Sequence, residues 1–177
     1  MIAVAILAIL LGIAAPSFRE SLLNARMTGR ANDLMADLNL TRSEAVKRNV
    51  TTYMCTSNDG TNCTASAWRE GWIVFADANQ NNVKDGNEPV IKSAAGQTDA
   101  TDTLTVTGHT LAGGIGYVPY EPSGVSKFGN TITFVFCDYR TVAQVGAGAA
   151  DLKGRQVTIN QTGRAVSARR TCASAAG

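Results

Sequence analysis

The hydrophobic pattern predicts one long helix at the start of the chain. The first eighteen residues carry no charged side chain and form a nearly unbroken apolar run as far as Pro16. From Phe18 to Ala45, apolar residues recur at the three-and-four spacing of one helical face. Because Pro near the start of a helical segment only bends it, we expect a helix over residues 1–48. Residues 1–18 form an apolar stalk, and an amphipathic part packed on the rest of the chain follows.

The stalk on its own is short for a bilayer span. Fifteen residues before Pro16 rise ~23 Å as a helix, against a hydrocarbon core of ~30 Å. A cleaved secretory signal is an alternative, because Gly12, Ile13 and Ala14 form a small-x-small site, but such signals have a basic segment before the apolar run. The first basic residue here is Arg19. The pattern therefore favours a retained stalk.

Large apolar side chains on a water-exposed stalk would cause aggregation. We therefore expect the stalk to pack against other stalks. Each large side chain buried there would contribute roughly 1.5–3 kcal/mol. The predicted assembly residues are Ile2, Val4, Ile6, Leu7, Ile9, Leu10, Ile13, Pro16 and Phe18.

The remainder, residues 50–177, has the pattern of a β-rich head that is long enough for one core. Alternating or β-branched segments bounded by Gly, Asn, Asp and Pro predict strands over 51–56, 71–76, 89–92, 103–107, 131–137, 156–160 and 165–170. The predicted fold class is α+β, with antiparallel sheets packed on the second part of the helix.

Four cysteines allow three disulfide pairings. Cys55 and Cys63 flank an Asn-Asp-Gly turn signal that brings them together, which leaves Cys137, at the end of a strand, to pair with Cys172 after the last strand. Zinc sites prefer tighter Cys spacing or His ligands, and the chain has one His, His109. Two disulfides place the head outside the cytoplasm.

The loop 77–88 has the ligand spacing of a calcium-binding loop. Counted from Asp77, oxygen side chains fall at positions one, three, five, nine and twelve. The candidate ligands are Asp77, Asn79, Asn81, Asp85 and Glu88. Position six, which needs Gly in that loop, is Asn82, and the flanking segments are predicted strands rather than helices. A polar hairpin loop whose side chains bond their own backbone is the alternative, and calcium is the only cofactor that the sequence brings into question.

Four segments resemble one protein family. They are the Pro-interrupted apolar segment leading into residues 40–49, the stretches 53–60 and 68–79, and the Thr-Gly-Arg at 162–164. In this order they resemble type IV minor pilins and the H-type pseudopilins, the group that includes FimT, FimU and GspH. The resemblance covers nearly the whole chain.

The resemblance implies a structural filament subunit, a minor pilin of a type IV pilus in the tip or initiation complex, or an H-type pseudopilin of type II secretion. Its partners would be other pilins, after a stage as a single-pass inner-membrane protein with a periplasmic head. Pilins of this family begin with an N-methylated Phe after a basic leader and carry a Glu in their first apolar stretch. Since the first Glu here is Glu20, we expect that leader and about six further residues to be missing, and restoring them would bring the stalk to spanning length.

Charge is uneven along the chain and raises a DNA-binding alternative. Residues 127–177 hold seven Lys or Arg against two Asp, a net of +5, whereas the whole chain is +2. DNA-binding relatives carry Gly-Arg-x-Arg in this tail, and Gly163-Arg164 keeps the first Arg only. The candidate phosphate contacts are Lys153, Arg155, Arg164, Arg169 and Arg170. A solvated strand face that pairs with acidic neighbours in the filament is the alternative.

Catalysis has little support in the sequence. His109 lies in a turn-like segment without a paired nucleophile, and the cysteines are expected to be oxidised. No phosphate loop, dinucleotide fingerprint or metal-hydrolase motif is present. We therefore do not expect an enzyme.

Overall fold

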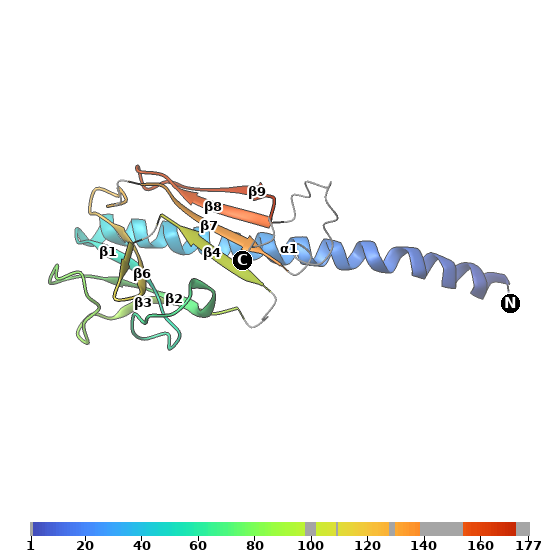
Figure 1. Cartoon of the computed structure of the whole chain (residues 1–177), viewed down its shortest axis with the longest axis horizontal. Coiled ribbons are helices and arrows are strands. Elements are labelled where there is room, and N and C mark those ends of the chain that lie inside the picture. The colour runs from blue at the N-terminus through green and yellow to red at the C-terminus, as the bar shows by residue number, and fades with distance from the viewer. Residues whose placement is uncertain (1, 98–101, 109, 128–129, 139–153, 173–177) are drawn as a thin grey trace.

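The computed structural model describes residues 2–97, 102–108, 110–127, 130–138 and 154–172, with side chains for all of these except 2–17 and 110–112. A single helix, α1 (Ile2–Arg48), forms the first quarter of the chain. Asn49 follows it with a left-handed φ of 56°, which ends the helix. The predicted helix is therefore confirmed, and its N-terminal half projects away from the head (Figure 1).

Within these described residues, nine strands form two antiparallel sheets. The first sheet has the order β3-β2-β1-β6-β5 and the second has the order β4-β7-β8-β9. The strands are β1 (Thr52–Thr56), β2 (Gly71–Ala76), β3 (Val90–Ala95), β4 (Thr103–Thr107), β5 (Thr110–Ala112), β6 (Ile115–Tyr120), β7 (Ile132–Cys137), β8 (Gly154–Ile159) and β9 (Ala165–Arg170), and a 3-10 helix, η1 (Trp68–Glu70), precedes β2. The α+β prediction is confirmed.

The sequence did not predict β5 and β6, although β6 is the inner partner of β1. Pro119 in β6 argues against a strand, because Pro cannot donate to a ladder. However, the Pro119 carbonyl accepts a hydrogen bond from the Lys127 backbone N–H at 3.3 Å, on the side away from β1. Since the nitrogen and carbonyl of one strand residue face the same side, the missing N–H of Pro119 costs no bond to β1.

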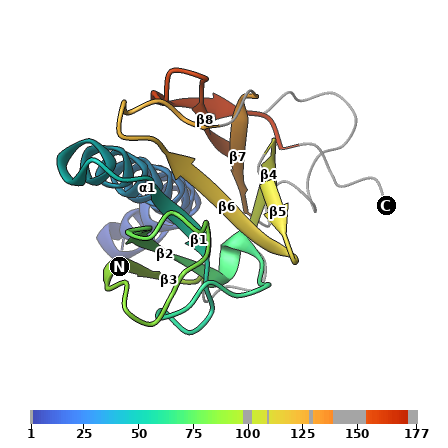
Figure 2. The ribbon, with the colours of Figure 1, turned by 90° about the vertical axis from the view of Figure 1, so that its left-hand side faces the viewer.

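The inner strands of the first sheet, β1, β2 and β6, are buried on both faces. Met54 and Val74 point into the main core beneath α1, whereas Cys55, Ile73 and Phe75 form a second cluster on the opposite face with two tyrosines, Tyr53 and Tyr117. Seen along the helix, strands of both sheets lie to one side of α1 (Figure 2). Burial on two faces explains why β2 is continuously apolar rather than alternating.

Candidate assembly interface on the long helix

In the part of the chain that the structure describes, fully buried positions on α1 begin at Met27. Met27 is 1% exposed, and further buried positions follow at three- and four-residue intervals. They are Ala31, Leu34, Leu38, Thr41 and Ala45. Before them, Phe18 and Leu22 are 65% and 54% exposed. We call residues 2–26 the projecting segment and residues 27–48 the docked segment.

This boundary differs from the expectation that α1 packs on its own domain from just after the stalk. Leu22 and Ala25 are exposed because they lie on another face of the helix: Leu22 is five residues before Met27, about 140° around the helix axis. Leu23, four residues before Met27, shares the buried face and is partly buried. The sequence missed Leu22 as an assembly residue, and only its continuity with the apolar stalk could have indicated it.

Polar contacts fix the middle of the docked segment to the head. The Trp72 indole Nε1 donates to Asp37 Oδ2 at 2.9 Å, and both residues are buried. One turn later, Arg42 Nε donates to the Gly124 carbonyl at 2.8 Å. These bonds join α1 to β2 and to the loop after β6, so the helix is held at two levels by directional contacts as well as by the core.

A second set of polar contacts lies where the docked segment begins. The buried Asp102 carboxylate, just before β4, accepts from Arg30 and forms an ion pair with Arg26 at 3.5 Å. In the other part of the second sheet, Arg155 Nη2 donates to Thr28 Oγ1 at 2.9 Å. The segment before the edge strand β4 and the inner strand β8 are therefore tied to the same two turns of α1.

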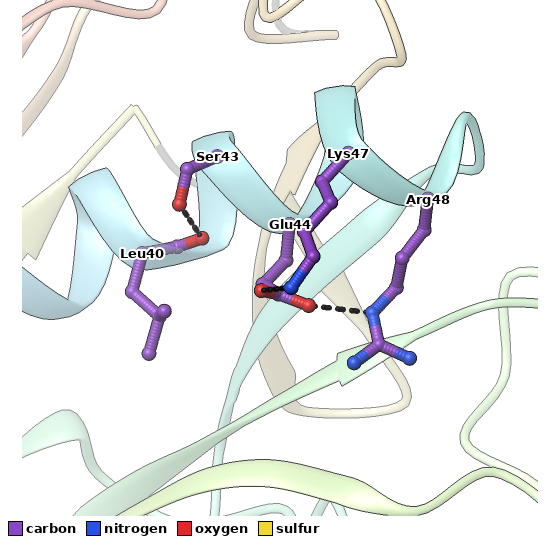
Figure 3. Close-up of polar contacts among 5 residues, drawn as sticks. All are labelled: Leu40, Ser43, Glu44, Lys47 and Arg48. Carbon is purple, nitrogen blue, oxygen red and sulfur yellow. Dashed lines mark hydrogen bonds and ion pairs between the residues drawn. The ribbon is translucent and has the colours of Figure 1, made fainter.

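Glu44 organises the last turn of α1, as Figure 3 shows. Its Oε2 accepts from Arg48 Nε at 2.5 Å, and its Oε1 lies 3.6 Å from Lys47 Nζ. The hydrogen bond from Arg48, followed by the charge of Lys47, holds the pKa of Glu44 below its ordinary value of 4.5. Ser43 Oγ donates to the Leu40 carbonyl at 2.9 Å. The two cations also favour the helix C-terminus.

The structure describes only part of the predicted stalk. Its backbone is helical from Ile2 onward. The side chains of Ile2, Val4, Ile6, Leu7, Ile9, Leu10, Ile13 and Pro16 lie outside the described residues, so their role in assembly stays a prediction. Phe18 is exposed, as an assembly residue would be before assembly. In the part of the chain that the structure describes, no helix is both long and apolar enough to cross a membrane.

Comparison with known proteins adds the family to this geometry. A family model described as the type II transport protein GspH matches residues 30–163, which is more than half of the chain. The chain belongs to this family. A comparison with curated protein sequences finds no match.

Solved structures agree with the GspH-family fold. The type IV minor pilin FimU of Pseudomonas aeruginosa is similar over 80% of this chain and 87% of its own, at 20% identity and a TM-score of 0.55. A second crystal form of FimU gives a TM-score of 0.53. The minor pseudopilin EpsH of Vibrio cholerae is similar at 13% identity, over 81% of this chain and 96% of its own, with a TM-score of 0.45.

Two of the four segments that resemble the pilin family have structural roles in this GspH-family head. The segment 40–49 supplies the Arg42 and Glu44 contacts described above. In the segment 162–164, Gly163 has a φ of 77° and lies against the Gly124 carbonyl and the Tyr120 ring. A side chain at Gly163 would collide with that carbonyl, so this Gly lets the turn between β8 and β9 pack on the loop after β6.

Both predicted disulfides are present in the structure. Cys55 is bonded to Cys63, with 5.6 Å between their Cα atoms, and Cys137 is bonded to Cys172, with 5.9 Å. The first bond closes the loop after β1. The second fastens the segment after β9, an edge strand, to the end of β7 in the same sheet.

The candidate calcium loop is held by its own backbone. Asp77 accepts from the backbone N–H groups of Asn81 and Asn82 at 3.1 and 2.9 Å, and Glu88 accepts from those of Ala78 and Asp85 at 2.7 and 3.1 Å. The remaining candidates bond one another, since Asp85 Oδ2 accepts from the side-chain amides of Asn79 and Asn81 at 2.7 Å each. Among the described residues, no three carboxylate, thiol or imidazole groups are placed to hold a metal ion. Calcium binding stays an untested prediction.

The structure separates the candidate DNA contacts. Arg155 lies directly opposite Arg169 across β8 and β9, next to Arg170, at the end of the sheet from which α1 projects. Arg164 lies in the turn at the opposite end, six residues and about 20 Å along the strand from Arg170. Lys153 lies outside the described residues. The predicted residues therefore do not form one continuous basic track, and DNA binding stays a prediction.

Proposed function

We propose that this chain is a minor subunit of a type IV pilus and that it enters the filament through the projecting segment of α1. The subunit would be held in the inner membrane by its stalk before assembly, with its head in the periplasm, and would then reach the extracellular pilus at its tip or initiation complex. Other pilins are its proposed partners. The likeness in fold to a type IV minor pilin supports this proposal.

One observation carries the proposal. Phe18 and Leu22 lie one turn apart on the same face of the projecting segment, and they are 65% and 54% exposed. Large apolar side chains in a row on an uncovered helix favour association with another apolar surface. Neighbouring helices of the same kind provide such a surface, and each large side chain buried there contributes roughly 1.5–3 kcal/mol.

A second candidate is a pseudopilin of type II secretion. The description of the matching family, a type II transport protein, favours it. Both candidates use the same assembly segment, and they differ only in which filament takes up the subunit. A deletion strain separates them: loss of surface pili with normal secretion supports the pilus, and the reverse result supports the secretion filament.

The assembly segment is tested by introducing a charge at Leu22 and by a matched change on the head. Leu22→Asp places a carboxylate in the proposed helix contact and should remove the subunit from sheared filaments, because an unpaired charge buried among apolar side chains costs several kcal/mol. Val83→Asp is the control, since Val83 is 52% exposed in the loop 77–88, which is bonded to Thr51 just beyond the C-terminal end of α1, far from Leu22. Immunoblots of the filament and membrane fractions measure incorporation.

We expect Leu22→Asp protein to stay in the membrane fraction at normal abundance, with Val83→Asp protein entering filaments normally. Ile9→Asp in the stalk should behave like Leu22→Asp. Normal incorporation of the Leu22→Asp and Ile9→Asp variants would contradict the proposal that this segment is the assembly surface.

A further inference from the structure

We propose that an arginine cluster on the head binds the anionic phospholipid headgroups of the membrane that holds the stalk. The cluster consists of Arg155 in β8 and of Arg169 and Arg170 in β9, and we call it the stalk-end cluster. This inference rests on the proposed function, because it needs the stalk to enter a bilayer.

The sheet register places all three arginines beside the base of the projecting segment. Arg155 Nη2 bonds Thr28 Oγ1, one residue beyond the start of the docked segment. In the antiparallel pairing of β8 and β9, Arg169 lies opposite Arg155, and Arg170 lies opposite Gly154. Figure 1 shows this end of β8 and β9 directed toward the projecting part of α1. The cluster therefore lies at the end of the head that would face a membrane.

Among the described residues, no carboxylate is paired with the arginines of the cluster. Arg155 and Arg169 are like charges directly opposite each other across two strands, an arrangement that is destabilising. The Asp102 carboxylate at the same end of the sheet is engaged by Arg26 and Arg30.

The contacts of the three arginines are with neutral groups. Arg155 bonds the Thr28 hydroxyl, and Arg170 Nη1 donates to the neutral Gln156 side chain at 3.0 Å. Arg169 is exposed. Within the described ranges of the chain, no carboxylate forms an ion pair with any of the three. An external anion is therefore the partner that this surface fits.

The distance to the bilayer suits a headgroup contact. Thr28 lies ten residues beyond Phe18, a rise of about 15 Å along the helix. The headgroup region of one leaflet occupies roughly 5–8 Å of that distance. The remaining gap is about one Debye length at physiological salt, and attraction of arginines to an anionic leaflet acts over that range. A typical helix tilt of about 20° lowers one side of the head further.

Lipid fits this surface better than duplex DNA. A duplex would need phosphate contacts along an extended track, and Arg164, the next candidate, lies at the opposite end of the hairpin. A membrane needs only a compact cationic face next to the stalk. The stalk-end cluster has that position: Arg155 and Arg169 share one face of the sheet, and Arg170 lies on the other face at the same end.

The test measures how closely the head approaches a membrane. The full chain is reconstituted into vesicles of phosphatidylcholine, or of phosphatidylcholine and phosphatidylglycerol in equal parts. The four cysteines form two disulfides, so Ala168→Cys, on the exposed β9 strand, accepts a single thiol-reactive donor dye. Energy transfer to an acceptor-labelled lipid reports the distance between β9 and the bilayer.

We expect greater energy transfer in the anionic vesicles, and the excess should disappear at high salt because screening shortens the Debye length. Arg169→Gln and Arg170→Gln should each reduce the population that contacts the anionic surface by roughly fivefold. Arg164→Gln is the matched control, since it makes the same charge change on the same hairpin at the other end, and it should leave the excess unchanged.

Three results would overturn the inference: equal transfer in both kinds of vesicle, equal losses from Arg164→Gln and Arg169→Gln, or removal of the excess by a soluble duplex oligonucleotide, which would assign the cluster to nucleic acid. Flotation of the same samples keeps the proposed function separate. A chain that fails to float with either vesicle contradicts the membrane stage of that function. A chain that floats with both vesicles without an anionic excess contradicts the headgroup contact alone.

Discussion

The docked and projecting segments of α1 belong to one uninterrupted helix but differ in what covers their apolar side chains. In the docked segment, Met27, Leu34 and Leu38 are almost completely buried by strands of both sheets. In the projecting segment, Phe18 and Leu22 lie one turn apart on roughly the opposite face of the helix, and they are exposed. The described head thus covers one face of α1, and this apolar pair on the other face has no cover from it.

The comparison has a functional meaning. Burial in the docked segment stabilises the head, whereas burial in the projecting segment is available only on assembly. Substitutions in the two segments should therefore separate stability from assembly.

The largest expected effect comes from a charge in the docked segment. Leu34→Asp buries an unpaired carboxylate at a position with 0% exposure, at a cost of several kcal/mol against a total stability of roughly 5–15 kcal/mol. Leu22→Asp should change the unfolding free energy of the head by less than about 0.5 kcal/mol. Urea unfolding in detergent micelles, followed by the fluorescence of Trp68 and Trp72, measures both. Equal destabilisation by the two changes would show that the head covers the projecting segment in solution.

Removing disulfides tests how β9 is kept beside the docked segment. Cys137 and Cys172 are 35 residues apart, and Cys55 and Cys63 are 8 residues apart. By loop-closure entropy, replacing Cys137 and Cys172 with Ser should lower the free energy of unfolding by roughly 3–4 kcal/mol. Replacing Cys55 and Cys63 with Ser should lower it by roughly 2–3 kcal/mol. Denaturation midpoints of the two double variants give the order. A larger loss from the shorter loop would show that native contacts, rather than chain entropy, dominate the effect.

A smaller effect is expected from the bond between Trp72 and Asp37. Trp72→Phe keeps an aromatic ring but leaves the buried Asp37 carboxylate without its indole donor, which should cost about 1–3 kcal/mol. Asp37→Leu, alone and combined with Trp72→Phe, completes a double-mutant cycle in the same unfolding assay. If the two single changes prove additive, the bond does not fasten the docked segment.

The smallest effect concerns pH at the last turn of α1. The hydrogen bond from Arg48 keeps the pKa of Glu44 lower in the folded state than its ordinary value of 4.5. The stabilisation of the folded state by ionised Glu44 is therefore fully present above pH 4.5 and is lost as the pH falls through the folded pKa. The ion pairs of Glu44 contribute at most about 1 kcal/mol to the free energy of unfolding. Glu44→Gln should reduce the loss of stability on acidification, and Glu70→Gln, at an exposed carboxylate of η1, serves as the control for charge.

The positions of the helix and strands follow from the sequence wherever local signals agree. The apolar spacing predicts α1 to Arg48, and alternation or Gly-rich boundaries predict seven of the nine strands. Strand β6 was not predicted because Pro119 argues against a strand, and its tolerance depends on a tertiary contact with Lys127 that no local pattern contains. The boundaries of β3 and β8 also differ from the prediction by two or three residues, which is ordinary where strand ends depend on their partners.

The assembly site was less predictable than the fold. The sequence indicates the apolar residues of the helix and the Cys55–Cys63 bond from local spacing, and the Cys137–Cys172 bond follows as the remaining pair. It does not indicate that coverage begins at Met27, because that boundary depends on where Asp102 and Arg155 meet α1 from strands far along the chain. It also does not show that Arg164 and Arg170 lie at opposite ends of a hairpin.

The polar contacts along the docked segment give α1 the mechanics of a lever. Thr28, Arg30, Asp37 and Arg42 are each bonded to a different part of the head, so the head and the docked segment turn as one body. The projecting segment extends about 37 Å beyond that fulcrum. A rotation of the head by roughly 10° would therefore sweep a straight helix tip through about 6 Å, more than one helical turn. A bend at Pro16 would shorten this arm, so the proline sets how much of the head's rotation reaches the helix tip.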